Sequence, residues 1–250
     1  MKRTITLIAF LLLAATQFAS GQAAILALIF GDKVASEKFN LSLELGVPIT
    51  RVSNIENAEA SNAINFGIGG NIKLSENWFL SPNVYFLSRR SFDVNPISLN
   101  SGDPDLDGLY TQTKAEFQLN YTDIHLLLAY EPNNSNFRFG LSPQVSFLGK
   151  ARATFIGELG DFDQSVKSML NKTDYGMIFN VGYFFRAGNK GKGLILNVRY
   201  YQGFADVFEQ GYFTGNNKAS YFSVHLSFPF VTDDLAKKNL EEAEKRKKKS

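Results

Sequence analysis

The stretch DPDLDG, residues 103–108, has the residue pattern with the clearest chemical meaning. Asp103, Asp105 and Asp107 stand at alternate positions before a glycine, as in the first half of an EF-hand loop, where such carboxylates bind Ca²⁺. The twelfth position of that loop holds a bidentate glutamate, but here it is Lys114. The pattern therefore predicts one of two structures: a calcium site, or a solvated acidic turn in a long loop.

The two histidines, His125 and His225, are the residues best suited to acid–base chemistry. Asp123 lies two residues before His125, and Ser223 and Ser227 flank His225 at the same spacing, so each set shares one face of a strand. Neighbours at this spacing are about 7 Å apart, too far for a direct bond between a nucleophile and a base without a cross-strand partner. The spacing favours hydrogen bonding, with a lipid-modifying hydrolase as the alternative.

Composition excludes several classes of function. The chain has 250 residues, which fits one domain, and its formal net charge of +2 gives no sign of nucleic-acid binding. The absence of cysteine excludes thiol catalysis, a disulfide framework and a lipid-anchored cysteine. We expect no catalytic residue and no cofactor apart from calcium in the acidic loop.

The elements that must position these residues are strands, because apolar and polar side chains alternate over eight segments bounded by polar or glycine-rich turns. The segments are residues 39–50, 62–75, 78–88, 117–132, 136–149, 174–186, 193–203 and 221–230. The fourth is irregular, since Ile124 and Leu126 follow one phase whereas Phe117, Leu119 and Tyr121 follow the other. This predicts a bulge near Tyr121–Asp123, or a strand that leaves the membrane there.

An even number of strands of about ten residues, joined alternately by short turns and long loops, is typical of outer-membrane barrels. We predict an all-β fold: an eight-stranded antiparallel up-and-down transmembrane β-barrel with both termini in the periplasm. Aromatic residues add an independent signal, because they gather at both strand ends as interfacial girdles do. The short-turn girdle is Phe39, Trp78, Tyr130, Phe137, Phe185 and Phe230, and the long-loop girdle is Phe86, Tyr121, Phe147, Tyr175, Tyr200 and Phe222.

The alternative barrel is a soluble, lipocalin-like periplasmic carrier with its apolar faces inward. The polar face consists of Asn, Ser, Gly and Gln with few charges, which favours a crowded interior over a solvated surface. Charged residues on that face must pair, because a lone buried charge is costly. The predicted interior polar network is Glu44, Lys73, Asp123, His125, Arg138, Arg199 and His225, with Arg186 as a further inward charge. A structural role is favoured over an ion or proton path.

The two ends of the chain differ from the barrel, residues 39–230. Lys2 and Arg3 precede a run too short to span a membrane, which predicts a signal peptide over residues 1–21, with a membrane anchor as the alternative. Residues 22–38 fit a short amphipathic periplasmic segment. The charged tail, residues 231–250, predicts a periplasmic helix capped by Thr232, more typical of a solvated helix than of a docked one. Phe230 resembles the aromatic end that the barrel-insertion machinery reads.

Several stretches resemble the PorT-like outer-membrane β-barrel proteins of Bacteroidota. They are IFGDKVASEKFNLSLELG, LNYTDIHLLLAYEP, GLSPQVSFLGKA, DYGMIFNVGYFF and LILNVRYYQGFADV, and together they cover about residues 29–230. Asp123 stands where that family usually has Glu, and His125 where it usually has Pro. The resemblance implies an eight-stranded barrel in the outer membrane of a Gram-negative bacterium. It does not extend to a role in protein secretion.

These observations predict a non-enzymatic outer-membrane barrel with a structural, scaffold or interaction role through long outer loops. The expected partners are outer-membrane lipids, the barrel-insertion machinery during biogenesis, and a protein in a larger outer-membrane complex. The lipid-modifying hydrolase and the soluble periplasmic carrier remain the alternatives.

Overall fold

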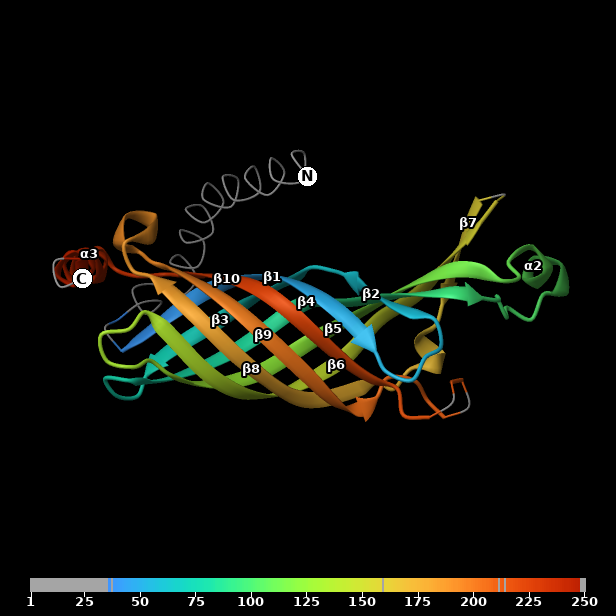
Figure 1. The fold of residues 1–250 in the computed structure, drawn as a ribbon, viewed down its shortest axis with the longest axis horizontal. Coiled ribbons are helices and arrows are strands. Elements are labelled where there is room, and N and C mark those ends of the chain that lie inside the picture. The colour runs from blue at the N-terminus through green and yellow to red at the C-terminus, as the bar shows by residue number, and fades with distance from the viewer. Residues whose placement is uncertain (1–35, 37, 159, 211, 214, 248–250) are drawn as a thin grey trace.

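The computed structural model describes residues 36, 38–158, 160–210, 212–213 and 215–247. The predicted signal peptide and residues 22–35 of the predicted amphipathic segment lie outside this part of the chain. Figure 1 shows a barrel of tilted strands with small helices at its two ends.

Ten strands form one antiparallel sheet that closes on itself through the pairing of the last strand with the first. They are β1 (Phe39–Val52), β2 (Ala58–Asn62), β3 (Asn65–Lys73), β4 (Trp78–Ile97), β5 (Thr113–Tyr130), β6 (Phe137–Gly157), β7 (Gly160–Ser165), β8 (Thr173–Phe185), β9 (Leu194–Asp206) and β10 (Lys218–Pro229). The helices are α2 (Pro104–Leu109), η2 (Lys167–Met169), η3 (Gly188–Gly191) and α3 (Asp233–Lys247).

The ring has eight strand positions among the described residues. Strands β2 and β3 both pair with β1 and β4, so they are two parts of one position, and β7 pairs only with β6. Each of the eight predicted segments falls in one of these positions. The eight-stranded up-and-down barrel is therefore confirmed.

The last strand shows which face meets lipid. In β10, Phe222 and Val224 are 62% and 51% exposed, whereas Ser223, His225 and Ser227 are buried. A soluble carrier would bury the apolar set and expose the polar set. The lipocalin-like alternative is therefore wrong, and the exposed apolar face is the one that a membrane barrel turns toward lipid.

Strand β5 alternates without interruption, although its sequence looks irregular. Phe117, Leu119 and Tyr121 point inward on the same face as Asp123 and His125. The register shifts lie opposite β5, in β4 after Tyr85 and in β6 before Ala151. The bulge predicted in this segment is therefore wrong, and the unbroken strand fits the alternative, a strand that continues beyond the membrane. Tyr121, expected in the outer girdle, is only 2% exposed and faces the interior.

The two ends of the barrel differ in size. At one end, here called the short-turn end, lie the β3–β4, β5–β6 and β8–β9 connections and α3. The other end is here called the long-loop end, and three strands project beyond the ring there. These strands, β4, β5 and β6, have 20, 18 and 21 residues, whereas β8 and β9 have 13 each. The difference of about seven residues corresponds to about 20 Å of strand. With β7 and α2, these strands form an extension beyond the ring (Figure 1).

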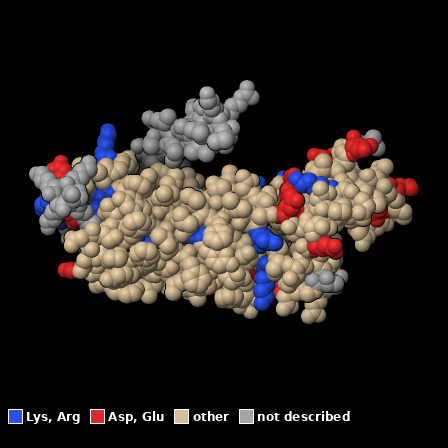
Figure 2. Space-filling model, in the orientation of Figure 1, with Lys and Arg blue, Asp and Glu red and all other residues tan. Residues whose placement is uncertain are grey.

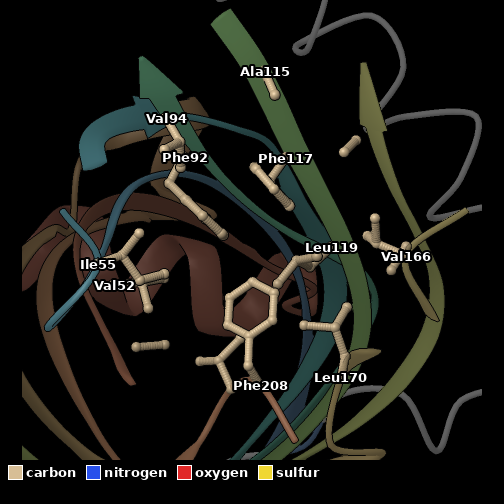
Figure 3. Close-up of a cluster of buried hydrophobic side chains, with 14 of the residues drawn as sticks. Val52, Ile55, Phe92, Val94, Ala115, Phe117, Leu119, Val166, Leu170 and Phe208 are labelled. Carbon is tan, nitrogen blue, oxygen red and sulfur yellow. The ribbon is translucent and has the colours of Figure 1, made fainter. Parts of the chain in front are cut away.

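An apolar cluster fills the barrel at the base of this extension. Figure 3 shows Phe92, Phe117 and Phe208 pointing toward one another from β4, β5 and the loop after β9. The rings of Phe92 and Phe117 stack 4.9 Å apart, and Phe208 meets both edge-on. Val166 and Leu170, from the segment around η2, cover the same cluster. The extension is surrounded by water, so burying these rings inside it stabilises the extension through the hydrophobic effect.

Helix α3 packs against the short-turn end. Its first turn is capped by Thr232, whose Oγ accepts from Leu235 N at 3.3 Å, as the sequence predicts. Ala236 and Asn239 are buried, and Asn239 Nδ2 donates to the carbonyl of Gly191 in η3 at 2.8 Å. The tail is therefore a docked helix, and the prediction of a solvated one is wrong. Within the described residues, every helix is too short or too polar to span a bilayer.

Candidate functional site

The first interior cluster surrounds Glu44 on β1. Arg199 on β9 forms an ion pair with it at 3.4 Å and donates to the hydroxyl of Tyr85 on β4. The Glu44 carboxylate also accepts from Ser42 at 2.8 Å and from Ser227 at 2.7 Å. Strand alternation directs all these side chains inward from four different strands. Glu44 and Arg199, both expected among the inward charges, thus form an ion pair, which leaves neither charge without a partner.

A second cluster is centred on Arg90, nearer the long-loop end. Its guanidinium pairs with Asp123 at 3.3 Å and with Asp174, and it donates to Ser146 at 2.6 Å. The ring of Tyr121 lies over it, 4.3 Å from the guanidinium carbon. Sequence reasoning missed Arg90 because it ended the third strand at residue 88. Alternation alone gave no signal for it, because the register shift in β4 after Tyr85 changes the phase: carried on from Tyr85, it would place Arg89 inward instead of Arg90.

A third cluster occupies the short-turn end. Glu131 accepts from Arg138 at 3.1 Å and from Arg186, and Arg186 reaches Glu242 on α3 at 3.5 Å. Arg138 is buried as predicted. Lys73 is not part of the interior, because it is exposed at the last residue of β3, where the strand leaves the ring. That predicted network member is therefore wrong.

Both histidines are buried at the middle of the barrel. His125 Nδ1 lies 3.1 Å from Ser142 Oγ on β6, which is the cross-strand partner that the sequence lacked, and His225 Nδ1 lies 3.4 Å from the Tyr85 hydroxyl. Gly46 opposite His225 has no room for a side chain, because a Cβ there would come within 2.3 Å of the imidazole.

The His125–Ser142 contact resembles the nucleophile and base of a hydrolase. It is closed to a substrate, and Asp123 does not serve as the third residue that would orient the histidine. Ser142 is 0% exposed and His125 is 3% exposed, so a lipid ester has no route to the serine in this arrangement. Asp123, which could orient His125, instead accepts from Ser88 at 2.6 Å and pairs with Arg90. The arrangement fits interior hydrogen bonding better than nucleophilic catalysis.

The three aspartates of the acidic loop serve a short helix. Asp103 caps α2, accepting from the backbone amides of Asp105 and Leu106, and Asp107 accepts from Ser101 N at 2.7 Å. The hydrogen bonds from the hydroxyl and the backbone amide of Ser101 lower the pKa of Asp107 below its usual value. Across the described residues, no group of three or more His, Cys, Asp or Glu is arranged to hold a metal. Calcium binding stays a prediction from spacing and would require this helix to rearrange.

The predicted short-turn girdle lies where the sequence places it. Trp78 pairs with Tyr130 across β4 and β5, with ring centres 5.1 Å apart. Phe137 and Phe185 both contact the ring of Tyr183. The members of the girdle point outward near the ends of their strands, and all are exposed or half-buried: Phe39, Trp78, Tyr130, Phe137, Phe185 and Phe230.

Comparison with known families agrees with this geometry. Residues 21–209 match the family model described as outer membrane protein beta-barrel domain. The chain belongs to this family. It is therefore an outer-membrane barrel, and the outward apolar face of its strands is the face that meets lipid.

Solved structures with related barrels share little sequence with this outer-membrane barrel. Ail, the attachment invasion locus protein of Yersinia pestis, solved with the heparin analogue sucrose octasulfate, is 10% identical, with a TM-score of 0.41 over 78% of this chain and 100% of Ail. Neisserial surface protein A is 11% identical, with a TM-score of 0.42 over 78% and 100%. OprG from Pseudomonas aeruginosa is 13% identical, with a TM-score of 0.37 over 79% and 98%. No curated protein sequence matches the chain.

Proposed function

We propose that this outer-membrane barrel is a non-enzymatic interaction or scaffold protein of the PorT-like type, which contacts a protein partner through the extension formed by β4 to β7. The observation that carries the proposal is the contrast between a filled interior and a large extension. The alternation of short and long connections supports an orientation with α3 in the periplasm and the extension outside the cell.

The filled interior argues against a transport role. The three charged clusters and the apolar cluster follow one another along the barrel, and their side chains cross it from opposite strands. An eight-stranded barrel is just wide enough for its own side chains to fill it. A solute would have to break several buried ion pairs in order to pass.

The extension has the character of a contact surface. It exposes several carboxylates, and Figure 2 shows acidic side chains gathered at this end, whereas the barrel wall carries few charges. They include Asp103, Asp105, Glu158, Asp161 and Asp163. Leu109 on α2 is 59% exposed among them. Acidic side chains around an exposed apolar residue fit a protein partner with a basic face.

Photo-crosslinking in living cells tests this proposal. A photoreactive amino acid at Leu109 should give a protein adduct of defined mass, whereas the same probe at Val198, which is 49% exposed on the lipid face, should give none. Both variants must retain the heat-dependent shift in gel mobility that shows an intact barrel. Ile156 is a second probe site on the extension. If the Leu109 and Ile156 variants are both folded and neither gives a protein adduct, the proposal is contradicted.

A lipid-modifying hydrolase is the second candidate because of the His125–Ser142 contact. That function requires His125→Ala to change the lipid profile of the outer membrane while the barrel stays folded. We expect the lipids of His125→Ala and His225→Ala cells to match those of the wild type. A changed acylation pattern in either folded variant would favour the enzyme instead.

A further inference from the structure

Two hollows lie on the outer wall. Both are lined by β4, β5 and β6; the first extends over β3 and β1, and the second is completed by β7 and Lys167. The first, of about 750 Å³, is apolar and ends toward the long-loop end at Phe86 and Phe147. The second, of about 490 Å³, begins on the same strands with Arg89, Gly149 and Lys150. Strand β5 shows that both open outward, because Ile124 in the first and Asn120 in the second share its outward phase.

The second hollow is strongly cationic. Its lining holds the four cations Arg89, Lys150, Arg152 and Lys167 against the single carboxylate of Asp163. It lies where the outward residues of β5 change from Ile124 and Leu126 to Asn120 and Gln118. This boundary places the cations at the edge of the apolar band, at the depth of lipid headgroups.

Two of the cations are held in place and two are free. Arg89 Nε donates to Asn120 Oδ1 at 2.9 Å, and Arg152 pairs with Asp163 at 3.1 Å while donating to Gln118 at 3.2 Å. Lys150 and Lys167 are exposed and have no ion-pair partner among the described residues. Lys150 also lies in the β6 bulge, where Leu119 and Tyr121 pair with Ala151 and Leu148.

We infer that the two hollows form one binding site for a phosphorylated glycolipid of the outer leaflet. The acyl chains lie in the apolar hollow, and a phosphate is held by the fixed guanidinium of Arg89 together with the free ammonium groups of Lys150 and Lys167. Arginine presents several donors to phosphate oxygens, and lysine supplies a mobile point charge. The inference rests on the proposed function for the orientation that brings this end of the wall to the outer leaflet.

The shape of the apolar hollow supports a lipid over a soluble anion. Gly70 gives it depth, because a Cβ there would contact Pro82 at 3.3 Å and Phe39 at 3.5 Å. A free anion would use the cations alone and gain nothing from the apolar hollow. A glycolipid uses both, since its charge and its chains meet at the same boundary.

The test is binding of lipid A to the full-length protein in detergent, measured by native mass spectrometry. Lys150→Gln/Lys167→Gln should bind bisphosphorylated lipid A about 30-fold more weakly than wild type, because each basic residue near a lipid surface contributes about a factor of five. The matched control is Lys190→Gln/Lys192→Gln, which removes two exposed lysines at the short-turn end and should bind as wild type does. Arg89→Gln is a second variant with the same expected direction.

Three outcomes would overturn the inference. In the first, Lys150→Gln/Lys167→Gln binds lipid A as tightly as wild type does; in the second, wild type binds dephosphorylated lipid A as tightly as bisphosphorylated lipid A. In the third, inorganic phosphate at millimolar concentration displaces lipid A. The last would mark a soluble-anion site. The heat-dependent gel shift of each variant and the Leu109 crosslink report separately on the barrel and on the proposed function. A failure of lipid binding alone therefore leaves both standing.

Discussion

The interior of this barrel has two regions of opposite character. In the membrane-spanning part, the inward side chains are polar and charged and the outward ones are apolar, as in the pair Arg199 and Val198. In the extension, the inward side chains are apolar, as Phe117 is, and their outward neighbours Glu116 and Gln118 are polar. The alternation of side chains is unbroken along β5, but its hydrophobic phase reverses.

The reversal follows from the solvent. Lipid is as apolar as the side chains that face it, so nothing drives those side chains inward, and the narrow interior collects the polar groups. Where the strands enter water, the hydrophobic effect returns and the apolar side chains turn inside. Tyr121 marks the boundary, because it belongs to the apolar cluster and also covers Arg90. Different forces therefore hold the two regions together.

Removing Arg90 should destabilise the membrane-spanning part more than any other change considered. Arg90→Met leaves Asp123 and Asp174 buried without their cation, and we expect a loss of about 3–5 kcal/mol in the free energy of unfolding. Urea titration in lipid vesicles measures it. Arg152→Met, which removes an exposed arginine from its pair with Asp163, is the matched control and should cost less than about 1 kcal/mol. Equal losses for the two variants would show that burial of the Arg90 pairs is not stabilising.

Removing an apolar side chain should break only the extension. Phe208→Ala opens a cavity against Phe92 and Phe117, and we expect a loss of about 3 kcal/mol confined to the long-loop end. Limited proteolysis should then cut the extension, while the heat-dependent gel shift stays unchanged. Phe204→Ala, which alters an exposed ring on β9, serves as the control and should leave the cleavage pattern as in the wild type. Loss of the gel shift in Phe208→Ala would mean that the two regions unfold together.

The docked tail gives a smaller effect at the opposite end. Asn239→Ala removes the hydrogen bond to the Gly191 carbonyl, and we expect α3 to lose about 1 kcal/mol of local stability. Hydrogen exchange of the amides of residues 235–245 should accelerate about five-fold, with exchange in β5 unchanged. Glu241→Ala, an exposed position on the same helix, is the comparison. Identical exchange in both variants would show that Asn239 does not hold the helix.

The smallest effect concerns the tip of the extension and depends on pH. Hydrogen bonds from Ser101 hold the pKa of Asp107 below its usual value, so their contribution to the order of this loop is present at neutral pH. It is lost as pH falls through that lowered pKa, below about pH 4. In Ser101→Ala the pKa should rise toward its ordinary value. A carboxyl titration followed by NMR checks this, and a pKa unchanged by Ser101→Ala would contradict it.

Much of the barrel could be predicted from alternation alone. The alternation in β10 correctly predicted which of its residues face lipid, because once one side chain of a strand is placed, alternation fixes the direction of all the others. The sequence also placed Glu44 and Arg199 among the inward charges that must pair, but not which charge pairs with which, because that depends on the register of strands distant in the chain.

The errors have physical causes. Tyr121 was assigned to the outer girdle because the rule that apolar side chains point outward holds only within the membrane, and β5 continues beyond it. The same change of phase suggested a bulge, whereas the alternative, a strand that leaves the membrane, fits the structure. Arg90 was missed because its strand was ended at residue 88, and because the register shift in β4 after Tyr85 exchanges the inward and outward phases before Arg90 is reached. Lys73 follows the inward phase but lies at the last residue of β3, where the ring no longer encloses it. The docking of α3 uses two buried residues, Ala236 and Asn239, and an ion pair of Glu242 with Arg186, and these contacts are hard to recognise in a charge-rich sequence.

A pair of double-mutant cycles tests the two-region account most directly. In the first, Arg90→Met is combined with Asp174→Leu; in the second, Arg90→Met is combined with Phe208→Ala. The free energy of unfolding is measured for each variant in lipid vesicles. The account predicts coupling of about 1–3 kcal/mol between Arg90 and Asp174, and additivity within about 0.5 kcal/mol between Arg90 and Phe208. Additive losses in the first cycle, or coupling of the same size in the second, would contradict it.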